Sequence, residues 1–214
     1  MNRRHFLSLS VAALSTASLL GLSTAHAMPF AFEEGVHYKK LPDSAHALVA
    51  KGTVQEFFFY ACPHCMDMES PLHDWLKSAP KNIVLEQIPA VFQTASWSLL
   101  ARVHYALKAN NQLTDELRAS LFNIFIKDHA RPKNNIEIAE LLLAKNSKFD
   151  KAGFIKTYDT EALNDDVTRA AKLSMQYQLE AVPAFIINGQ YLTDLPMAGN
   201  HTKLFALIEQ LANI

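Results

Sequence analysis

The chain has 214 residues, half of them hydrophobic, which is enough for one domain with a full core or one domain with an insertion. Its 20 basic and 21 acidic residues give a formal charge of −1, so no basic surplus points to nucleic acid as a partner. Its two cysteines are three positions apart, a spacing typical of redox chemistry or metal binding and not of structural disulfides.

Residues 1–27 have the pattern of a secretory signal peptide. Arg3 and Arg4 form a charged start, an apolar stretch follows, and Ala25–Ala27 provide a small-x-small cleavage signal. An uncleaved membrane anchor is disfavoured because the apolar run is short and interrupted. The arginine pair also resembles the twin-arginine export motif, so the Sec and twin-arginine routes both stay open. We expect a soluble, exported mature protein.

The next part of the chain predicts a strand, a helix and a second strand. A short edge strand is expected at 36–41. Thr53–Tyr60 is mostly β-branched or aromatic and too short for a surface helix, so it predicts a buried strand. Pro63, whose missing N–H costs nothing in a first turn, begins a helix that ends near residue 78. With a strand at 82–90 this makes a βαβ unit, whose two strands are parallel.

The middle and the end of the chain differ in pattern. From 94 to 178 apolar residues recur at steps of three and four, which predicts four or five helices and no strand. Ala184–Ile187 and Gln190–Thr193 flank Asn188-Gly189, a pair that supplies both positive-φ positions of a type I′ turn, so a β-hairpin is expected. An amphipathic helix at 204–211 closes the chain.

The two cysteines lie where the central strand gives way to the helix. Cys62 falls at the helix N-terminus, where unpaired N–H groups and the helix dipole favour a thiolate, the reactive form of cysteine. Pro63 starts the helix, and His64 adds a donor or a positive charge that lowers the pKa of Cys62 further. Cys65, one turn on, is expected to be less exposed. This pair can open and close one small disulfide ring.

These features together resemble a known family. The order of elements looks like the thioredoxin fold, an α/β fold, here with an inserted all-helical domain. The motif Phe57–Cys65, the helical insert and Val182-Pro183-Ala184-Phe185 are similar to the DsbA family of periplasmic thiol oxidases, over nearly the whole mature chain. The resemblance implies a thioredoxin-like domain made of 28–93 and 179–214, and a helical insertion at 94–178.

The resemblance also implies roles for individual residues. Cys62 becomes the nucleophilic sulfur and Cys65 its resolving partner. Val182-Pro183 becomes a cis peptide facing the disulfide, where the backbone of Val182 pairs with an extended substrate. Glu56 matches the family's buried acid beneath the site and is expected to handle protons, with an exposed side chain at a strand edge as the alternative.

Two positions depart from the family pattern. Ala181 stands where many relatives carry glycine, and Gln87 stands where some members place a lysine near the buried acid. These departures put the tuning of Glu56 in doubt more than the main reaction.

The implied function is a thiol:disulfide oxidoreductase that donates the Cys62–Cys65 disulfide to reduced exported polypeptides in the periplasm, through a mixed disulfide at Cys62. No Gly-rich phosphate loop follows a strand, so neither flavin nor nicotinamide is expected as a cofactor. An external acceptor must then reoxidise the protein, and the resemblance implies a DsbB-type, quinone-linked membrane protein. We expect a monomer.

Four other readings compete with this one. A zinc site would need two more ligands near the cysteines, and His73 and His104 stand without a partner motif. Covalent haem attachment fails because Met66, not histidine, follows the second cysteine. A disulfide isomerase or reductase is the alternative within the redox class, although about 25 residues before the central strand leave no room for the separate dimerisation domain that isomerases carry. A non-catalytic, chaperone-like peptide binder is the alternative from another class.

Overall fold

The computed structural model describes residues 30–92 and 94–214. The predicted signal peptide, with Arg3 and Arg4, lies outside the described residues. Within these residues, no helix combines the length and the apolar character needed to cross a membrane.

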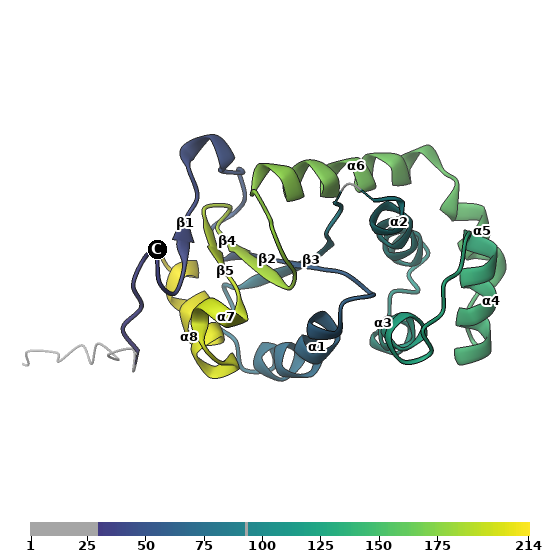
Figure 1. Cartoon of the computed structure of the whole chain (residues 1–214), viewed down its shortest axis with the longest axis horizontal. Coiled ribbons are helices and arrows are strands. Elements are labelled where there is room, and N and C mark those ends of the chain that lie inside the picture. Colours follow the sequence, from purple (N-terminus) through teal and green to yellow (C-terminus); the bar gives the residue numbers. More distant parts are fainter. Residues whose placement is uncertain (1–29, 93) are drawn as a thin grey trace, which may run out of the picture.

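A five-stranded mixed sheet forms the centre of the molecule, in the order β1-β5-β4-β2-β3 (Figure 1). Only β2 and β3 are parallel, as expected for a βαβ unit, and each of the other neighbouring pairs is antiparallel. The strands span Lys39–Lys40 (β1), Thr53–Phe58 (β2), Val84–Pro89 (β3), Ala184–Ile187 (β4) and Tyr191–Thr193 (β5).

Five α-helices occupy the chain between β3 and β4, and no strand interrupts them over 94–183. We refer to α2 to α6 as the helical segment. The α/β fold class is confirmed, while the division of the chain into two domains stays a prediction. The helices span Pro63–Leu76 (α1), Ala95–Ala109 (α2), Asp115–Phe122 (α3), Asn135–Lys145 (α4), Lys151–Tyr158 (α5), Glu161–Gln176 (α6), Leu195–Ala198 (α7) and His201–Ala212 (α8), with a π-helical turn at Asn123–Lys127.

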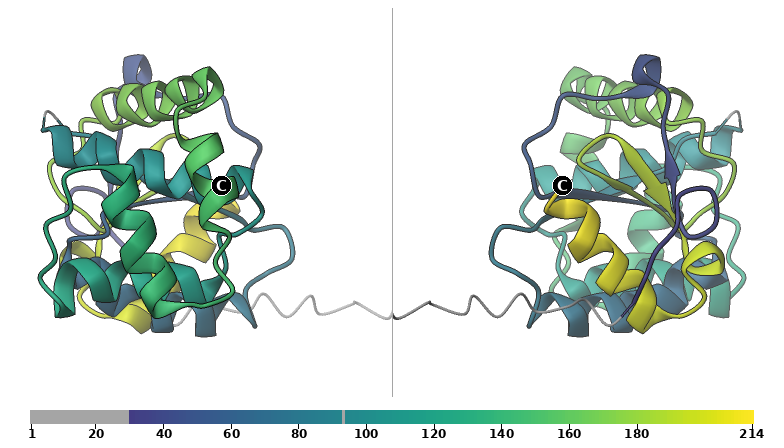
Figure 2. Two further views of the ribbon diagram at one scale, coloured as in Figure 1. Left: turned by 90° about the vertical axis from the view of Figure 1, so that its right-hand side faces the viewer. Right: turned by 90° about the vertical axis from the view of Figure 1, so that its left-hand side faces the viewer.

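Helices cover both faces of the sheet (Figures 1 and 2). On one face α1 and α8 pack together, with the rings of Trp75 and Phe205 stacked at 4.9 Å between centroids. On the other face lies α6, which runs from the far end of the helical segment back to the sheet. Phe57 and Phe58 of β2 share one buried core with Leu121 and Phe122 of α3, so the helical segment is packed onto the sheet by the same core that buries β2.

The edge strand is shorter than the sequence predicts. The expected strand at 36–41 contains only Lys39–Lys40, because the preceding residues form a turn. Gly35 has a φ of +84°, and its N–H donates to the carbonyl of Tyr38. The sequence also predicts neither the short helix α7 nor the start of α8 at His201, where the Asn200 side chain caps the helix.

The predicted β-hairpin is present. Asn188 and Gly189 have φ values of +53° and +66°, and the N–H of Gln190 donates to the carbonyl of Ile187. This turn holds β4 and β5 in register.

Replacing Gly189 by alanine tests the turn. Positive φ costs an L-residue about 1–2 kcal/mol, and a Cβ at Gly189 would also lie 2.3 Å from the carbonyl oxygen of Ala47. Gly35 is a matched control, because its φ is also positive while nothing lies within 4 Å of an added Cβ. We expect Gly189→Ala to lower the free energy of unfolding by more than Gly35→Ala does, measured by urea titration. Equal losses would contradict this account of the turn.

Candidate active site

Cys62 lies at the junction between β2 and α1, as the sequence predicts. It is the N-cap of α1, with an extended backbone, and Pro63 occupies the first turn. The Cys62 N–H donates to the carbonyl of Phe59 at 3.0 Å, which closes the turn out of the strand. Cys62 is partly exposed, whereas Cys65, one turn into the helix, is buried, and both are free thiols. Substrate can therefore reach one sulfur and not the other.

The two sulfurs differ sharply in proton affinity. A hydrogen bond from the Cys65 thiol is the main reason why the pKa of Cys62 falls to about 6, against the opposing effect of burial. The N–H groups of Cys65 and His64 and the charge of the His64 ring lower it further. Burial raises the pKa of Cys65 far above its ordinary value, and its contact with Cys62 raises it further. At neutral pH the pair therefore holds one thiolate, on Cys62, and one thiol.

The loop before β4 brings Val182 and Pro183 to the same place. Ala184, at the start of β4, pairs with Phe57 near the end of β2, so the residues before it lie beside the cysteines. The Val182–Pro183 peptide is cis. The Val182 carbonyl oxygen lies 3.5 Å from Cys62 Sγ, and the neighbouring Ala181 is exposed. This loop edge leaves backbone beside the reactive sulfur for an extended peptide.

Glu56 is fully buried in β2, which rules out the exposed alternative. Side chains alternate along a strand, so Glu56 shares the face of Val54, which packs with Met68 and Leu72 of α1 in one core. Burial is the main reason why the pKa of Glu56 rises to about 7, so the carboxyl group titrates near neutral pH. Its role in proton transfer stays a prediction.

The neighbours of Glu56 include one residue that sequence reasoning singled out and two that it missed. Gln87 pairs with Glu56 across β2 and β3 and donates from Nε2 to Glu56 Oε2 at 2.7 Å. The missed residues are Arg118 of α3, whose Nη2 lies 3.9 Å from Glu56 Oε2, and Glu69 of α1, which binds Arg118. The available signal was a charged residue on the apolar face formed three and four positions later by Leu121 and Phe122.

The buried histidine near the site has a structural contact. His104 Nδ1 and the Tyr60 hydroxyl are 3.0 Å apart, and burial holds the pKa of His104 well below its ordinary value. Across residues 30–92 and 94–214, no group of three or more His, Cys, Asp or Glu side chains could hold a metal ion.

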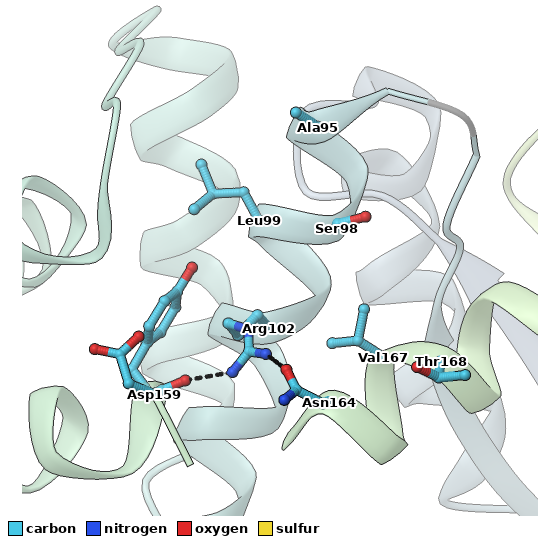
Figure 3. Close-up of a pocket in the computed structure, with 9 residues that line it drawn as sticks. Ala95, Ser98, Leu99, Arg102, Asp159, Asn164, Val167 and Thr168 are labelled. Carbon is cyan, nitrogen blue, oxygen red and sulfur yellow. Dashed lines mark hydrogen bonds between the residues drawn. The ribbon is translucent and has the colours of Figure 1, made fainter. Parts of the chain in front are cut away.

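A hollow of about 710 Å³ lies elsewhere, between α2, the end of α5 and α6 (Figure 3). Arg102 points into it, and its guanidinium donates to the carbonyl of Tyr158 at 2.6 Å and to the Asn164 side chain. These contacts tie three helices of the helical segment together. The residues that line this hollow include neither cysteine nor Glu56, so we place the chemistry at Cys62.

The origin of the low pKa of Cys62 is testable by following thiolate absorbance in the ultraviolet. We expect the reduced protein to titrate near pH 6 and both Cys65→Ala and His64→Ala to raise that midpoint, Cys65→Ala more, because its thiol contributes most. His73→Ala, on the same helix, is the control that should leave the midpoint unchanged. A wild-type midpoint near 9, the ordinary value, would contradict the geometry.

This chain is similar to known proteins over most of its length. A family model described as thioredoxin matches residues 47–203. The thiol:disulfide interchange protein DsbA of Azotobacter vinelandii is 31% identical over 195 residues, which cover 90% of this chain and 88% of that protein. DsbA of Pseudomonas syringae pv. tomato is 29% identical over 201 residues, covering 94% and 91%.

The likeness extends to solved structures. The crystal structure of Pseudomonas aeruginosa DsbA superposes with a TM-score of 0.77 at 26% identity, over 85% of this chain and 93% of that one. The family-model match over 47–203 takes in β2 to β5, the Cys-Pro-His-Cys helix and the helical segment. The chain therefore belongs to the DsbA family of thiol:disulfide oxidoreductases, within the thioredoxin superfamily.

Proposed function

We propose that this enzyme oxidises thiols of exported polypeptides by passing on a Cys62–Cys65 disulfide. The observation that carries the proposal is the contrast between the two sulfurs. Cys62 is accessible and has a pKa near 6, while Cys65 is buried and holds its proton. Such a pair favours the reduced state, so giving away the disulfide is downhill.

The first step is attack of a substrate thiolate on Cys62 Sγ. The bond between Cys62 and Cys65 breaks, a mixed disulfide forms at Cys62, and Cys65 leaves with the electron pair. Because the pKa of the Cys65 thiol is raised so far, this sulfur must take up a proton. Glu56 is buried, its charge acts on Cys65, and its pKa is about 7, so it is the proton donor in this proposal.

The second step releases the product. Another substrate thiolate attacks the substrate sulfur of the mixed disulfide, and Cys62 leaves as a thiolate stabilised by its own helix. Two electrons have passed from the substrate to the enzyme. Of the two substrate protons, one is matched by the proton on Cys65 and the other goes to solvent. During both steps the Val182 backbone, next to Pro183, holds the substrate peptide beside Cys62.

The setting of this reaction is also part of the proposal. The substrates are reduced polypeptides in the periplasm, which the enzyme reaches after its residues 1–27 direct export by the Sec or twin-arginine route. A DsbB-type, quinone-linked membrane protein regenerates the disulfide. Two features support this setting: the signal pattern in the sequence and the membership of the DsbA family.

The function is tested by equilibrating the protein with glutathione and by mixing its oxidised form with a reduced, unfolded polypeptide. We expect the polypeptide to gain disulfides and both Cys62→Ser and Cys65→Ser to lose the activity, because neither variant can form the Cys62–Cys65 disulfide. When oxidised glutathione is supplied as the oxidant, Cys65→Ser should instead hold a mixed disulfide at Cys62. A potential near that of thioredoxin, about −270 mV, would overturn the oxidase proposal. A protein that binds the unfolded polypeptide without oxidising it, with binding unchanged in Cys62→Ser, would instead indicate a non-catalytic peptide binder.

The stability of the two redox forms should diverge with pH. The pKa of Cys62 is depressed in the folded protein, so its thiolate stabilises the reduced form fully above the unfolded pKa, near 9, and not below about 6. The thiolate adds about 1–2 kcal/mol to the free energy of unfolding of the reduced form at pH 7. Above pH 9 it adds at most about 4 kcal/mol, an upper limit because Cys62 is partly exposed and solvent screens its contacts.

Urea unfolding at several pH values measures this effect. We expect the reduced form to be the more stable one at neutral pH and its lead over the oxidised form to widen as the pH rises. The reduced Cys62→Ser variant, which lacks the thiolate, is the control and should lose this pH dependence. Equal urea midpoints for both redox forms at every pH would refute the prediction.

A further inference from the structure

A buried arginine lies beneath the active site, on the helical segment. Arg118 of α3 is 3% exposed. Its Nε and Nη2 donate to the two carboxylate oxygens of Glu69 at 2.6 and 2.8 Å, a two-point contact. Its Nη2 also lies 3.9 Å from Glu56 Oε2. One guanidinium thus faces two carboxyl groups, one on α1 and one on β2.

Arg118 is held in place by aromatic rings as well. The guanidinium carbon lies 4.0 Å from the ring centre of Phe58, and 5.6 and 5.7 Å from those of Tyr60 and Phe122. A planar guanidinium stacks on such rings while keeping its fork of donors directed outward. Arg118 is therefore held between Glu69 and these three rings.

The two carboxyl groups share this charge unequally. Glu69 takes two short hydrogen bonds from Arg118 and also lines an open groove between α1 and α3, where solvent reaches it. Glu56 has no such access. Its Oε1, like Nη1 of Arg118, is buried without a hydrogen-bond partner among the described residues. The negative charge of ionised Glu56 is therefore only partly balanced by Arg118 and by hydrogen bonds.

Among the described residues, the remaining surroundings of Glu56 add no second cation. Its partner on β3 is a neutral amide, and its partner on β4 is an aromatic ring. In the part of the chain that the structure describes, the polar and titratable groups that act with Glu56 are Arg118 from α3, Glu69 and Cys65 from α1, Gln87 from β3 and Tyr60 after β2.

We propose that Arg118 and Glu69 are positioning residues that set how tightly Glu56 holds its proton. Arg118 weakens the hold of Glu56 on its proton, and Glu69 strengthens it because its own negative charge partly neutralises Arg118. The helical segment thereby supplies the counter-charge that tunes the proton donor for Cys65. This inference rests on the proposed function, in which Glu56 protonates Cys65.

Arg118 and Glu69 are expected to shift the pKa of Glu56 in opposite directions, which can be tested. Opposite charges within about 4–6 Å lower a carboxyl pKa by about 1–3 units, and like charges raise it. Arg118→Met should therefore raise the pKa of Glu56 by at least about one unit, and Glu69→Gln should lower it by about one unit. Arg118→Lys keeps a positive charge and should give a smaller rise than Arg118→Met.

The measurement is carbon-13 NMR of the full-length reduced protein with labelled glutamate carboxyl groups. The Glu56 signal is assigned by its loss in Glu56→Gln. Arg169→Met is the matched control, because Arg169 of α6 also joins the helical segment to β3, through Glu86, and does not appear among the groups acting on Glu56. It should leave the titration of Glu56 unchanged.

A second readout concerns the reaction itself. The pH profile for reduction of the oxidised protein by dithiothreitol should move with the pKa of Glu56, up in Arg118→Met and down in Glu69→Gln. A purely structural role would lower stability in both variants and shift both profiles alike or not at all. If Arg118→Met does not fold, the conservative Glu69→Gln and Arg118→Lys variants decide the matter.

Shifts of the Glu56 pKa in the same direction, or no shift, overturn the proposal. So does a shifted NMR titration with unshifted kinetics, because Arg118 and Glu69 would then act on Glu56 without acting on the reaction. The NMR titration does not require the protein to be an oxidase. Failure of the oxidase proposal appears instead in the glutathione equilibrium.

Discussion

The structure depends on one interaction, the stabilisation of the Cys62 thiolate by the first turn of its own helix. The buried strand β2 ends, Pro63 starts α1, and the sulfur is left facing the Cys65 thiol and two backbone N–H groups. The two N–H groups are fixed by the backbone of α1, whereas the Cys65 thiol becomes a donor once the disulfide opens and Cys65 gains its proton. A preorganised site of this kind stabilises charge more than water does, because no reorganisation is needed. A disulfide at Cys62 has no thiolate to stabilise, so the proposed reaction runs toward the reduced protein.

The sheet brings the rest of the site to that sulfur. The antiparallel pairing of β4 with β2 places Val182, which is 120 positions away in the chain, against Cys62. The parallel pairing of β2 with β3 places Gln87 against Glu56. Sheet register therefore adds Val182 to the surroundings of Cys62 and Gln87 to those of Glu56, while the local sequence of α1 supplies the hydrogen-bond donors.

Local signals in the sequence predicted much of the sheet and the position of Cys62. The central strand, predicted at 53–60 and observed at Thr53–Phe58, depends on a few neighbouring residues, as do the proline at the start of α1 and the Asn-Gly turn, so the sequence alone indicates them. The predicted edge strand was too long because the backbone turn at Gly35 competes with strand pairing. The pattern of apolar residues carries no information about a positive φ. The role of Arg118 could not be predicted either, since its contacts lie on β2 and α1, and only packing brings these elements together.

The shared core has a consequence for how such an enzyme can be changed. Leu121 and Phe122 of α3 pack in the same core as Phe57 and Phe58, and the rings around Arg118 come from both β2 and α3. A chain trimmed to sheet and flanking helices would not be a smaller version of this enzyme. It would expose the apolar face behind the cysteines and leave two acids there without their arginine.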